Sequence, residues 1–223
     1  MIDRQGRAVD LSLYLVTDTA LCGAFGVAAT VRAAVTAGVT VVQLRDPLAT
    51  DTEFVQLGRE VAQVLHGSGV PLIVNDRVQL VAPIGADGAH IGQGDLDPVK
   101  AREVLGPASL LGLSVQTTHH VSQAERLGPD VIDYLGVGPV WPQATKPDAA
   151  PPVGVHSLRE IAKASPWPCV AIGGITASRA RALRGSGIGG IAVVSAICGQ
   201  QDVPTAVLAL QQAWQPAARP GTG

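Results

Sequence analysis

The amino-acid sequence predicts an α/β protein that folds as a single (β/α)8 TIM barrel. The first observation is that eight short apolar runs recur along the 223 residues and alternate with stretches of helical composition. The second is that no change in composition marks a boundary between two domains. The third is that hydrophobic residues make up 47% of the chain but aromatic residues only 3%. A core of Val, Leu, Ile and Ala is typical of parallel strands buried beneath helices.

The eight predicted strands are the short apolar runs, which are rich in Val, Leu and Ile. They span residues 12–17, 40–44, 72–75, 88–91, 110–114, 131–137, 169–172 and 190–195.

The predicted helices lie between these strands. Residues 27–36 end before Gly38 and residues 52–65 end before Gly67, and glycine is common just beyond the C-terminus of a helix. The remaining helical stretches are residues 99–105, 121–127, 158–164, 178–183 and 205–214.

The alternation predicts one catalytic domain over residues 1–215. The tail at residues 216–223 is rich in Pro, Gly and Ala, so we expect it to be flexible. The longest irregular loop spans residues 138–155. A long loop on a compact barrel is more often an active-site cover than a simple connection.

Composition and charge exclude several classes of function. The net charge is −2 and no basic run is present, which argues against nucleic-acid binding. No apolar stretch approaches the roughly 20 residues that cross a bilayer, and residues 1–10 lack an apolar signal region. Cys22, Cys169 and Cys198 show neither metal-ligand spacing nor a disulfide pattern. We therefore expect a cytoplasmic protein with small-molecule partners; whether it forms a homo-oligomer stays open.

The unusual polar residues follow directly after the predicted strands. Because the carboxyl ends of parallel strands meet on one face of a barrel, these residues are expected to converge. Amide, carboxylate, guanidinium and ammonium groups at one mouth indicate a site for a metal and a phosphorylated substrate. The residues are Gln43–Arg45, Asn75–Asp76, Gly92–Asp95, Ser114, Thr145–Lys146, Gly173–Gly174 and Val194–Ser195.

Asp76 and Asp95 follow neighbouring predicted strands, so their carboxylates should lie close together. Two like charges at close range share either a proton or a cation. Mg²⁺ suits one or two carboxylates that are completed by substrate phosphates. The alternative is that both residues are helix caps, with Asp95 capping the helix that begins near Asp97.

Two consecutive loops carry the features of a phosphate site. Gly173 and Gly174 follow the seventh predicted strand, and Ser195 follows the eighth. Glycine lets backbone N–H groups approach an anion, and barrels usually bind phosphate in these two loops. The alternative is that the glycines only form the turn.

Three further polar residues face the predicted mouth. Arg45 can bind a phosphate bidentately, and Gln43 has the same strand parity. Lys146, in the long loop, is either an anion-binding or a solvated side chain. The histidines are interpreted as surface or packing residues: His66, His90, His119, His120 and His156.

The ordered set of motifs strongly resembles the thiamine phosphate synthase family, and it extends from Tyr14 to Ile197. Each motif is weak alone, but the order is specific. The motifs are Tyr14-Leu-Val-Thr-Asp18, Val42-Gln-Leu-Arg45, Val74-Asn-Asp-Arg77, Gly92-Gln-Gly-Asp-Leu96, Gly136-Val-Gly-Pro-Val-Trp-Pro142, Thr145-Lys-Pro-Asp148, Ala171-Ile-Gly-Gly-Ile175 and Ala192-Val-Val-Ser-Ala-Ile197.

The resemblance implies a transferase of thiamine biosynthesis. Enzymes of the family join 4-amino-5-hydroxymethyl-2-methylpyrimidine diphosphate to a thiazole monophosphate and release pyrophosphate. Pyrophosphate leaves first, a pyrimidine-stabilised cation forms, and the thiazole nitrogen captures it. The charge that gathers on the leaving group calls for electrostatic and metal-ion catalysis rather than proton transfer.

The resemblance also implies a role for each matching residue. Asp76 and Asp95 are expected to bind Mg²⁺, and the catalytic residues are expected to be Arg45, Lys146 and Ser114. The residues expected to bind the pyrimidine diphosphate are Gln43, Arg45, Asn75, Ser114 and Lys146. Those expected to bind the thiazole phosphate are Thr145, Gly174, Val194 and Ser195. Five neighbours complete the predicted substrate site: Leu44, Asp46, Pro47, Gln143 and Ala144.

Two positions depart from the family pattern. Pro47 stands where the family usually has the lysine of Gln-x-Arg-x-Lys, which removes a charge and a backbone donor. Gln143 stands where the family usually has the first threonine of Thr-x-Thr-Lys. Whether another cation, such as Arg77, replaces the lysine stays open.

Three alternatives share much of the pattern. A related thiazole tautomerase has no pyrophosphate to ionise, which Asp76, Asp95 and Lys146 argue against, although Pro47 mildly favours it. A phosphate-binding isomerase of tryptophan biosynthesis would share the Gly174 and Ser195 loops but not the two carboxylates. A relative that binds ligands without turnover is the third alternative. Release of pyrophosphate in the presence of both substrates separates all of them from a synthase.

Overall fold

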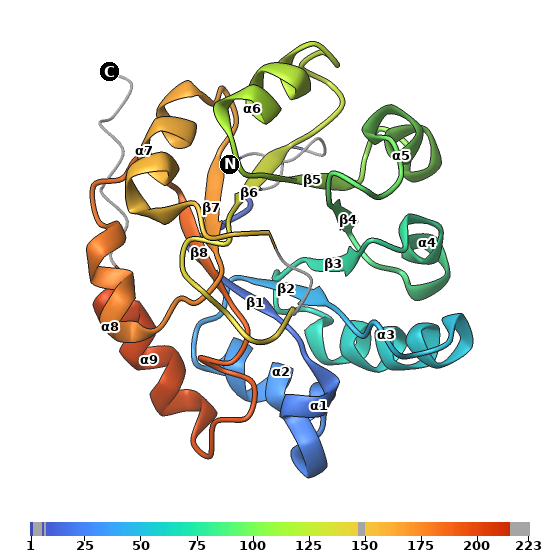
Figure 1. Cartoon of the computed structure of the whole chain (residues 1–223). Helices are drawn as coiled ribbons and strands as arrows, with labels where there is room; N and C mark the ends of the chain where they lie inside the picture. Colours follow the sequence, from blue (N-terminus) through green and yellow to red (C-terminus); the bar gives the residue numbers. More distant parts are fainter. Residues whose placement is uncertain (2–5, 7, 147–149, 215–223) are drawn as a thin grey trace.

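The computed structural model describes residues 1, 6, 8–146 and 150–214. Its eight parallel strands close into a barrel in which each strand pairs with the next and β8 pairs with β1 (Figure 1). The predicted (β/α)8 barrel is therefore confirmed. The predicted tail at residues 216–223 and the motif residues Pro147 and Asp148 lie outside the described residues. The assignment of residues 1–215 to one catalytic domain stays a prediction.

The strands lie within the predicted apolar runs, apart from one added residue at the end of β5. They are β1 (Leu13–Val16), β2 (Val41–Leu44), β3 (Leu72–Asn75), β4 (Gly88–Ile91), β5 (Leu110–Val115), β6 (Tyr134–Val137), β7 (Cys169–Ile172) and β8 (Gly190–Val193). The start of β6 differs most from the prediction, which placed it at Val131. At Asp133 the backbone N–H still donates to Leu111 O (2.8 Å), but the Asp133 carboxylate, which pairs with Arg102 (2.7 Å), is the acceptor for Leu111 N (2.8 Å).

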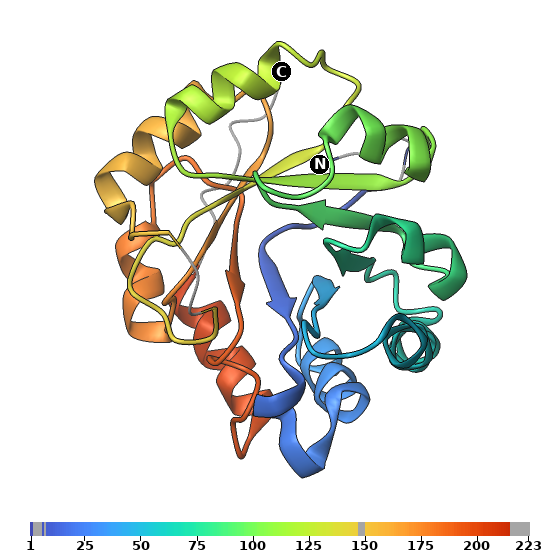
Figure 2. The same cartoon turned by 45° about the vertical axis from the view of Figure 1, so that its right-hand side comes forward.

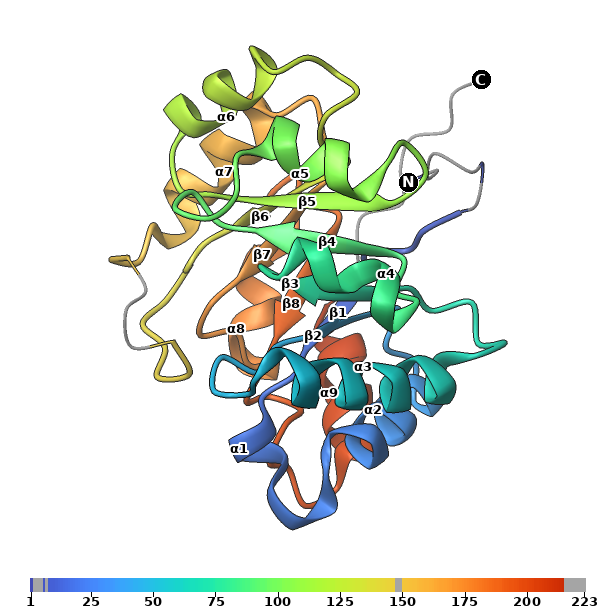
Figure 3. The same cartoon turned by 90° about the vertical axis from the view of Figure 1, so that its right-hand side faces the viewer.

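Helices surround the barrel on its outside, as the turned views in Figures 2 and 3 show. They are α1 (Thr19–Cys22), α2 (Val27–Thr36), α3 (Asp51–Leu65), α4 (Val81–Ile84), α5 (Pro98–Leu105), α6 (Thr118–Glu125), α7 (Gly154–Ala164), α8 (Ala177–Ala180) and α9 (Val203–Ala213). Three 3-10 turns accompany them: η1 (Gly23–Phe25), η2 (Val78–Leu80) and η3 (Arg181–Leu183). Over the described residues no single helix is long and apolar enough to cross a membrane. The segments Thr19–Phe25 and Val27–Thr36 reach that length and composition only when taken together, and they are bent by 87° relative to each other.

The sequence did not predict the helical segment between β3 and β4. There η2 and α4 follow each other, and α4 has only 4 residues. Pro83 within α4 lacks an N–H, and Gly85 ends α4 in a left-handed conformation (φ 79°). A segment this short shows no helical periodicity. The predicted helix at residues 178–183 is also divided, into α8 and η3.

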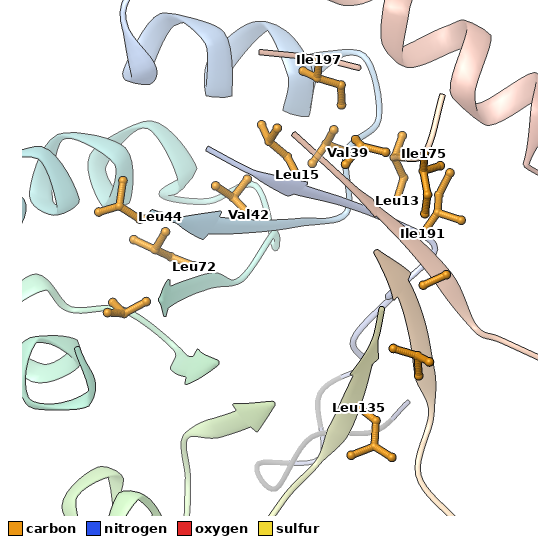
Figure 4. Packing of buried hydrophobic residues seen from close by; sticks show 14 of the residues in the cluster. Leu13, Leu15, Val39, Val42, Leu44, Leu72, Leu135, Ile175, Ile191 and Ile197 are labelled. Carbon is orange, nitrogen blue, oxygen red and sulfur yellow. The ribbon is translucent and has the colours of Figure 1, made fainter. Parts of the chain in front are cut away.

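The main hydrophobic core lies between the strands and the surrounding helices. Figure 4 shows part of it, with Leu13, Leu15, Val42 and Leu44 on the first two strands and Ile197 after β8. All five side chains are at most 2% exposed. This layer fixes the strands against the helices and leaves every second strand residue to face the barrel axis.

A second cluster fills the barrel interior and closes it at its amino-terminal end. Val9 and Leu11, just before β1, pack there with inward-facing residues of the strands. Those inward-facing residues are Tyr14, Val16, Val41, Ile73, Leu110, Tyr134, Val170 and Ala192. Nearer the carboxyl ends of the strands, the same face carries Gln43, Asn75, His90 and Ser114. The barrel is therefore apolar at one end and polar at the other.

Candidate active site

Arg45 connects three segments at the carboxyl end of the barrel. Its backbone N–H donates to the hydroxyl of Thr17 at the end of β1 (3.0 Å). Its guanidinium lies 4.0 Å from the carboxylate of Asp18 and 3.5 Å from the carbonyl oxygen of Thr145. Thr145 belongs to the loop between β6 and α7, which crosses the barrel in Figure 1 (yellow). The predicted cover loop therefore reaches the end of β2, and Asp18 joins the site as a residue that sequence reasoning did not single out.

Asp76 has an unusual backbone and an unusual acidity. Its φ is 59°, in the left-handed region that few residues other than glycine adopt, and its N–H donates to His90 O (2.9 Å). Burial, and next the negative charge of Asp95, raises the pKa of the Asp76 carboxyl to about 6, while Lys146 acts in the opposite direction. The two carboxylates therefore lie close enough to interact, as the strand order predicted, and the Lys146 ammonium of the long loop lies near Asp76 as well.

The interpretation of these two aspartates as helix caps is wrong. Asp97, not Asp95, caps α5 by accepting hydrogen bonds from Val99 N (3.0 Å) and Lys100 N (3.2 Å). Asp95 instead accepts from Gly92 N (2.7 Å). The turn η2 after Asp76 begins with no side-chain cap at all. Neither carboxylate therefore caps a helix, and Asp95 instead holds the turn from Gly92 to Asp95.

The donor set at Asp76 and Asp95 fits Mg²⁺. No group of three or more His, Cys, Asp or Glu side chains that could hold a metal is found in the described part of the chain. A site with two hard oxygen donors and no nitrogen or sulfur ligand suits a cation that takes its remaining ligands from water and substrate phosphates. The repulsion that raises the Asp76 pKa is the interaction that such a cation would relieve.

The loops after β7 and β8 lie on the same face of the barrel. Gly173 and Gly174 have φ values of 97° and 65°, so their N–H groups point in directions that other residues rarely allow. The Arg179 guanidinium donates to Gly174 O (2.7 Å) and lies 5.6 Å from the Trp141 ring. Sequence reasoning missed Arg179, which brings a cation to the predicted phosphate loop. Ser195 is exposed just beyond β8.

Polar side chains also cross the interior of the barrel. Gln43 Nε2 donates to Tyr14 Oη (2.8 Å), and this hydroxyl lies 2.9 Å from Tyr134 Oη. His90 connects Tyr134 (3.2 Å from Nδ1) with Ser114 Oγ (2.9 Å from Nε2). Burial lowers the pKa of the His90 imidazole to about 4, despite the opposing charge of Asp95. His90 is thus a partly buried packing residue, as predicted, but it also joins two groups of the site, the Tyr134 hydroxyl and the predicted site residue Ser114.

A family model described as thiamine monophosphate synthase matches residues 13–197. The chain belongs to this family. It is 46% identical over 202 residues to the thiamine-phosphate synthase of Psychrobacter sp. (strain PRwf-1), which covers 90% of this chain and 94% of that protein. It is 44% identical over 208 residues to the thiamine-phosphate synthase of Desulfitobacterium hafniense (strain Y51), which covers 93% of this chain and 99% of the relative.

A solved structure agrees with these relatives. Thiamine phosphate pyrophosphorylase from Pyrococcus furiosus superposes with a TM-score of 0.81 at 33% identity, over 92% of this chain and 96% of that one. 3-Hexulose-6-phosphate synthase superposes with a TM-score of 0.66 at 17% identity, which shows a shared fold alone. The predicted family and its transferase activity are confirmed.

The first departure from the family pattern lies in the loop between β2 and α3. Pro47 is exposed there. The Arg77 guanidinium donates to Asp51 Oδ1 (3.1 Å), Ala49 O (2.6 Å) and Asp46 O (3.3 Å). Arg77 therefore holds this loop and the start of α3 in place through three hydrogen bonds of its guanidinium.

The second departure lies in the loop between β6 and α7. Gln143 Oε1 accepts hydrogen bonds from Thr145 Oγ1 (2.9 Å) and Lys146 N (2.8 Å). Its Nε2 donates to Lys146 O (2.6 Å). Gln143 thus closes the turn that carries Thr145 and Lys146, a role within the loop that motif comparison does not reveal.

The other predicted substrate-binding residues lie at or near the same mouth. Asp46 Oδ1 accepts from Leu48 N (3.1 Å), which shapes the β2–α3 loop, and Ala144 is exposed beside Thr145. Leu44 is 0% exposed and packs in the outer core, so its side chain faces away from the barrel axis. A substrate contact by Leu44 would come from its backbone. The roles of all predicted site residues in binding stay predictions.

Proposed function

We propose that this chain couples 4-amino-5-hydroxymethyl-2-methylpyrimidine diphosphate to a thiazole monophosphate, which yields thiamine phosphate and pyrophosphate. The observation that carries the proposal is that Asp76 and Asp95 follow the paired strands β3 and β4, while Arg45 meets the loop of Thr145 and Lys146 at the same mouth. Such a pair of carboxylates beside cations suits a metal-bound diphosphate better than a single phosphate ester. The relatives named above support the same reaction.

The residues at the mouth divide into two groups in this proposal. Arg45 and Lys146 bind the diphosphate of the pyrimidine substrate, with Arg45 held between Asp18 and the cover loop. Their positive charges stabilise the charge that gathers on the leaving pyrophosphate. Asn75 and Ser114 lie deeper, at the ends of β3 and β5, where they contact the pyrimidine.

The thiazole phosphate binds on the opposite side of the mouth. Backbone N–H groups of Gly174 and Ser195 approach this phosphate, with Val194 and Thr145 beside it. Arg179 adds a guanidinium that is already in contact with the Gly174 loop. The thiazole nitrogen then faces the pyrimidine carbon from which pyrophosphate departs.

Asp76 and Asp95 hold Mg²⁺ in this proposal. When bound, the ion neutralises charge on the diphosphate and makes it a better leaving group. Burial and the charge of Asp95 raise the pKa of the Asp76 carboxyl, and the side chain of Asn75, which precedes it, offsets this rise in part. No residue has to transfer a proton at the reacting carbon, which agrees with the lack of a general base among the predicted catalytic residues.

Pyrophosphate release tests the proposal. We expect release only when both substrates and Mg²⁺ are present, and we expect Asp95→Asn to abolish it. Asp97→Asn is the matched control, because asparagine caps a helix as well as aspartate does, so α5 and the activity should be retained. A wild-type protein that binds the thiazole phosphate but releases no pyrophosphate would instead be a tautomerase-like or non-catalytic relative.

The cellular location and the oligomeric state also belong with this function. Location in the cytoplasm is the setting expected for an enzyme that uses small phosphorylated substrates. A homo-oligomer stays open, and the reaction as proposed uses residues of one chain only.

A further inference from the structure

Five side chains form a continuous hydrogen-bonded path through the barrel interior. They come from β1, β2, β4, β5 and β6, and we call them the polar relay: Gln43, Tyr14, Tyr134, His90 and Ser114. Both ends of the polar relay, Gln43 and Ser114, are residues predicted to bind the pyrimidine substrate. The three residues between them have no part in the mechanism above.

The barrel is built to admit these side chains. A Cβ atom at Gly112 on β5 would collide with both His90 and Tyr134. A Cβ atom at Gly136 on β6 would lie 2.8 Å from His90 Cε1. The centroids of the Tyr14 and Tyr134 rings are 6.1 Å apart, and those of His90 and Tyr134 are 5.5 Å apart. Glycine at two inward positions therefore allows an imidazole to lie between Tyr134 and Ser114.

The hydrogen bonds of the polar relay run in one donor-to-acceptor direction. Because Gln43 Nε2 donates to Tyr14, the Tyr14 hydroxyl uses its own hydrogen toward Tyr134. In this arrangement Tyr134 accepts from Tyr14 and has its own hydrogen for His90 Nδ1, which lies 3.2 Å away. A neutral imidazole that accepts at Nδ1 carries its hydrogen on Nε2, which donates to Ser114 Oγ. Each hydroxyl accepts one hydrogen bond and donates one, so reversing a single bond reverses the whole path.

The direction determines what each end offers to a ligand. With the path in this direction, Ser114 Oγ accepts from His90 Nε2 (2.9 Å), so its own hydrogen points to another acceptor. Gln43 donates inward, and among the described residues its Oε1 takes part in no hydrogen bond, which leaves it as an acceptor. A ring that fits both ends carries an acceptor opposite Ser114 and a donor opposite Gln43.

We propose that Tyr14, Tyr134 and His90 are positioning residues that fix Ser114 as a donor and Gln43 Oε1 as an acceptor, and thereby select a 4-aminopyrimidine over its 4-oxo counterpart. This inference rests on the proposed function, since it concerns the same pyrimidine diphosphate. A 4-aminopyrimidine presents a ring-nitrogen acceptor beside an amino donor. The 4-oxo ring, with a hydrogen on the neighbouring nitrogen, presents the reverse pattern and leaves buried polar groups unpaired.

The first experiment determines the direction of the hydrogen bonds from the His90 tautomer and needs no activity assay. In protein labelled with ¹⁵N-histidine, long-range ¹H–¹⁵N correlation spectra distinguish the two imidazole tautomers, and His90→Gln assigns the signal. We expect the Nε2–H tautomer at neutral pH in the free protein. The Nδ1–H tautomer, or rapid averaging of both, would overturn the inference.

The second experiment measures the selectivity for the 4-amino over the 4-oxo pyrimidine. Kinetics with 4-amino and 4-oxo pyrimidine diphosphates give the ratio of kcat/KM for the wild type, Tyr134→Phe and the control Ser186→Ala. Tyr134→Phe keeps the ring but removes the hydroxyl, so His90 can change tautomer and the ratio should fall by about tenfold or more. Ser186 bears a buried hydroxyl that donates to Leu183 O (2.6 Å), apart from the barrel interior, so its loss should leave the ratio unchanged.

The outcomes separate this inference from the proposed function. If the wild type releases no pyrophosphate from the 4-amino substrate, the proposed function fails, whatever the tautomer. If pyrophosphate is released but Tyr134→Phe keeps the wild-type ratio, the inference alone fails. If Tyr134→Phe unfolds, Tyr14→Phe interrupts the same path at the neighbouring hydroxyl. The kcat/KM ratio of that variant then tests the inference in the same way.

Discussion

At the scale of single residues, Asp76 combines a rare backbone conformation with an acidity shifted by its surroundings. Only glycine, asparagine and aspartate adopt a φ of 59° readily, so the position admits few replacements. The half-buried carboxylate faces the like charge of Asp95. Such an arrangement costs stability in the absence of a cation and is typical of sites that bind one.

The first prediction concerns Asp76→Asn. Asparagine tolerates the same φ, so the fold should be retained while pyrophosphate release falls by at least about a hundredfold, as when one group that stabilises developing charge is removed. Because folding raises the Asp76 pKa to about 6, the native state binds its proton more tightly than the unfolded state does. The stability from this group is complete below pH 3.8 and is lost as the pH rises through about 6.

Thermal unfolding in metal-free buffer at pH 4 and pH 8 checks the sign. Asp76→Asn should raise Tm relative to the wild type at pH 8, where the wild-type carboxylate is charged, and the gain should vanish at pH 4. Asp97→Asn should show no such gain at pH 8. Equal Tm differences at both pH values would mean that the charge of Asp76 does not oppose folding.

The second prediction concerns Pro47. Three hydrogen bonds, to Asp51 and to the carbonyls of Ala49 and Asp46, tie Arg77 to the β2–α3 segment, which argues against its replacing the family's lysine. A missing donor to the leaving group typically costs on the order of 3 kcal/mol, or roughly a hundredfold in rate. We expect the wild type to be slow and Pro47→Lys to raise kcat by up to about that factor. Side-by-side kcat measurements decide it, and an unchanged or lower rate would show that the missing charge does not limit the enzyme.

At the scale of elements, strand ends could be predicted well and side-chain partners poorly. Asp76 and Asp95 could be paired from sequence because neighbouring parallel strands end side by side. The path from Gln43 to Ser114 could not, since it depends on barrel closure and on the room left by Gly112 and Gly136. Likewise, α4 was missed because four residues with an internal proline carry no periodic signal.

The third prediction concerns the loop between β7 and α8. A Cβ atom at Gly174 would lie 2.6 Å from Pro142 O and 3.1 Å from Arg179 Nη1, and φ there is 65°. Gly174→Ala should therefore raise KM for the thiazole phosphate about tenfold or more and leave KM for the pyrimidine diphosphate nearly unchanged.

Gly185→Ala is the matched control. Gly185 has a similar φ of 70°, but a Cβ atom added there would have no atom within 4 Å. Both variants should lose about 1 kcal/mol of stability from the left-handed conformation. Initial-rate kinetics with each substrate varied in turn separate them. If Gly185→Ala raised the thiazole phosphate KM as much as Gly174→Ala, the effect would be general strain rather than a local phosphate contact.

At the scale of the whole molecule, the barrel separates stability from function along its axis. Val9 and Leu11 close the amino-terminal end with apolar inward residues, and the polar residues of the mouth lie at the carboxyl end. The eightfold alternation made this polarity predictable, since the mouth of a barrel forms at the strand ends. The closure of this end by Val9 and Leu11 was not predictable, because residues 1–10 read as a polar segment and Leu11 precedes the first predicted strand.

The last prediction tests that separation with Leu11→Ala. Leu11 is 5% exposed in the inner cluster, so truncation should leave a cavity and lower the free energy of unfolding by roughly 2–5 kcal/mol. Both KM values should stay within about twofold of the wild type, since a small change at the amino-terminal end does not displace strand ends at the other end of a close-packed barrel. Leu208→Ala is the control, because that leucine is 49% exposed on α9 and its loss should change stability by less than about 0.5 kcal/mol. Urea unfolding and initial rates on the same preparations give both quantities. A Leu11→Ala protein with near-wild-type stability but a raised KM would mean that the interior of the barrel transmits its packing to the mouth, and the two ends would then have to be treated as one unit.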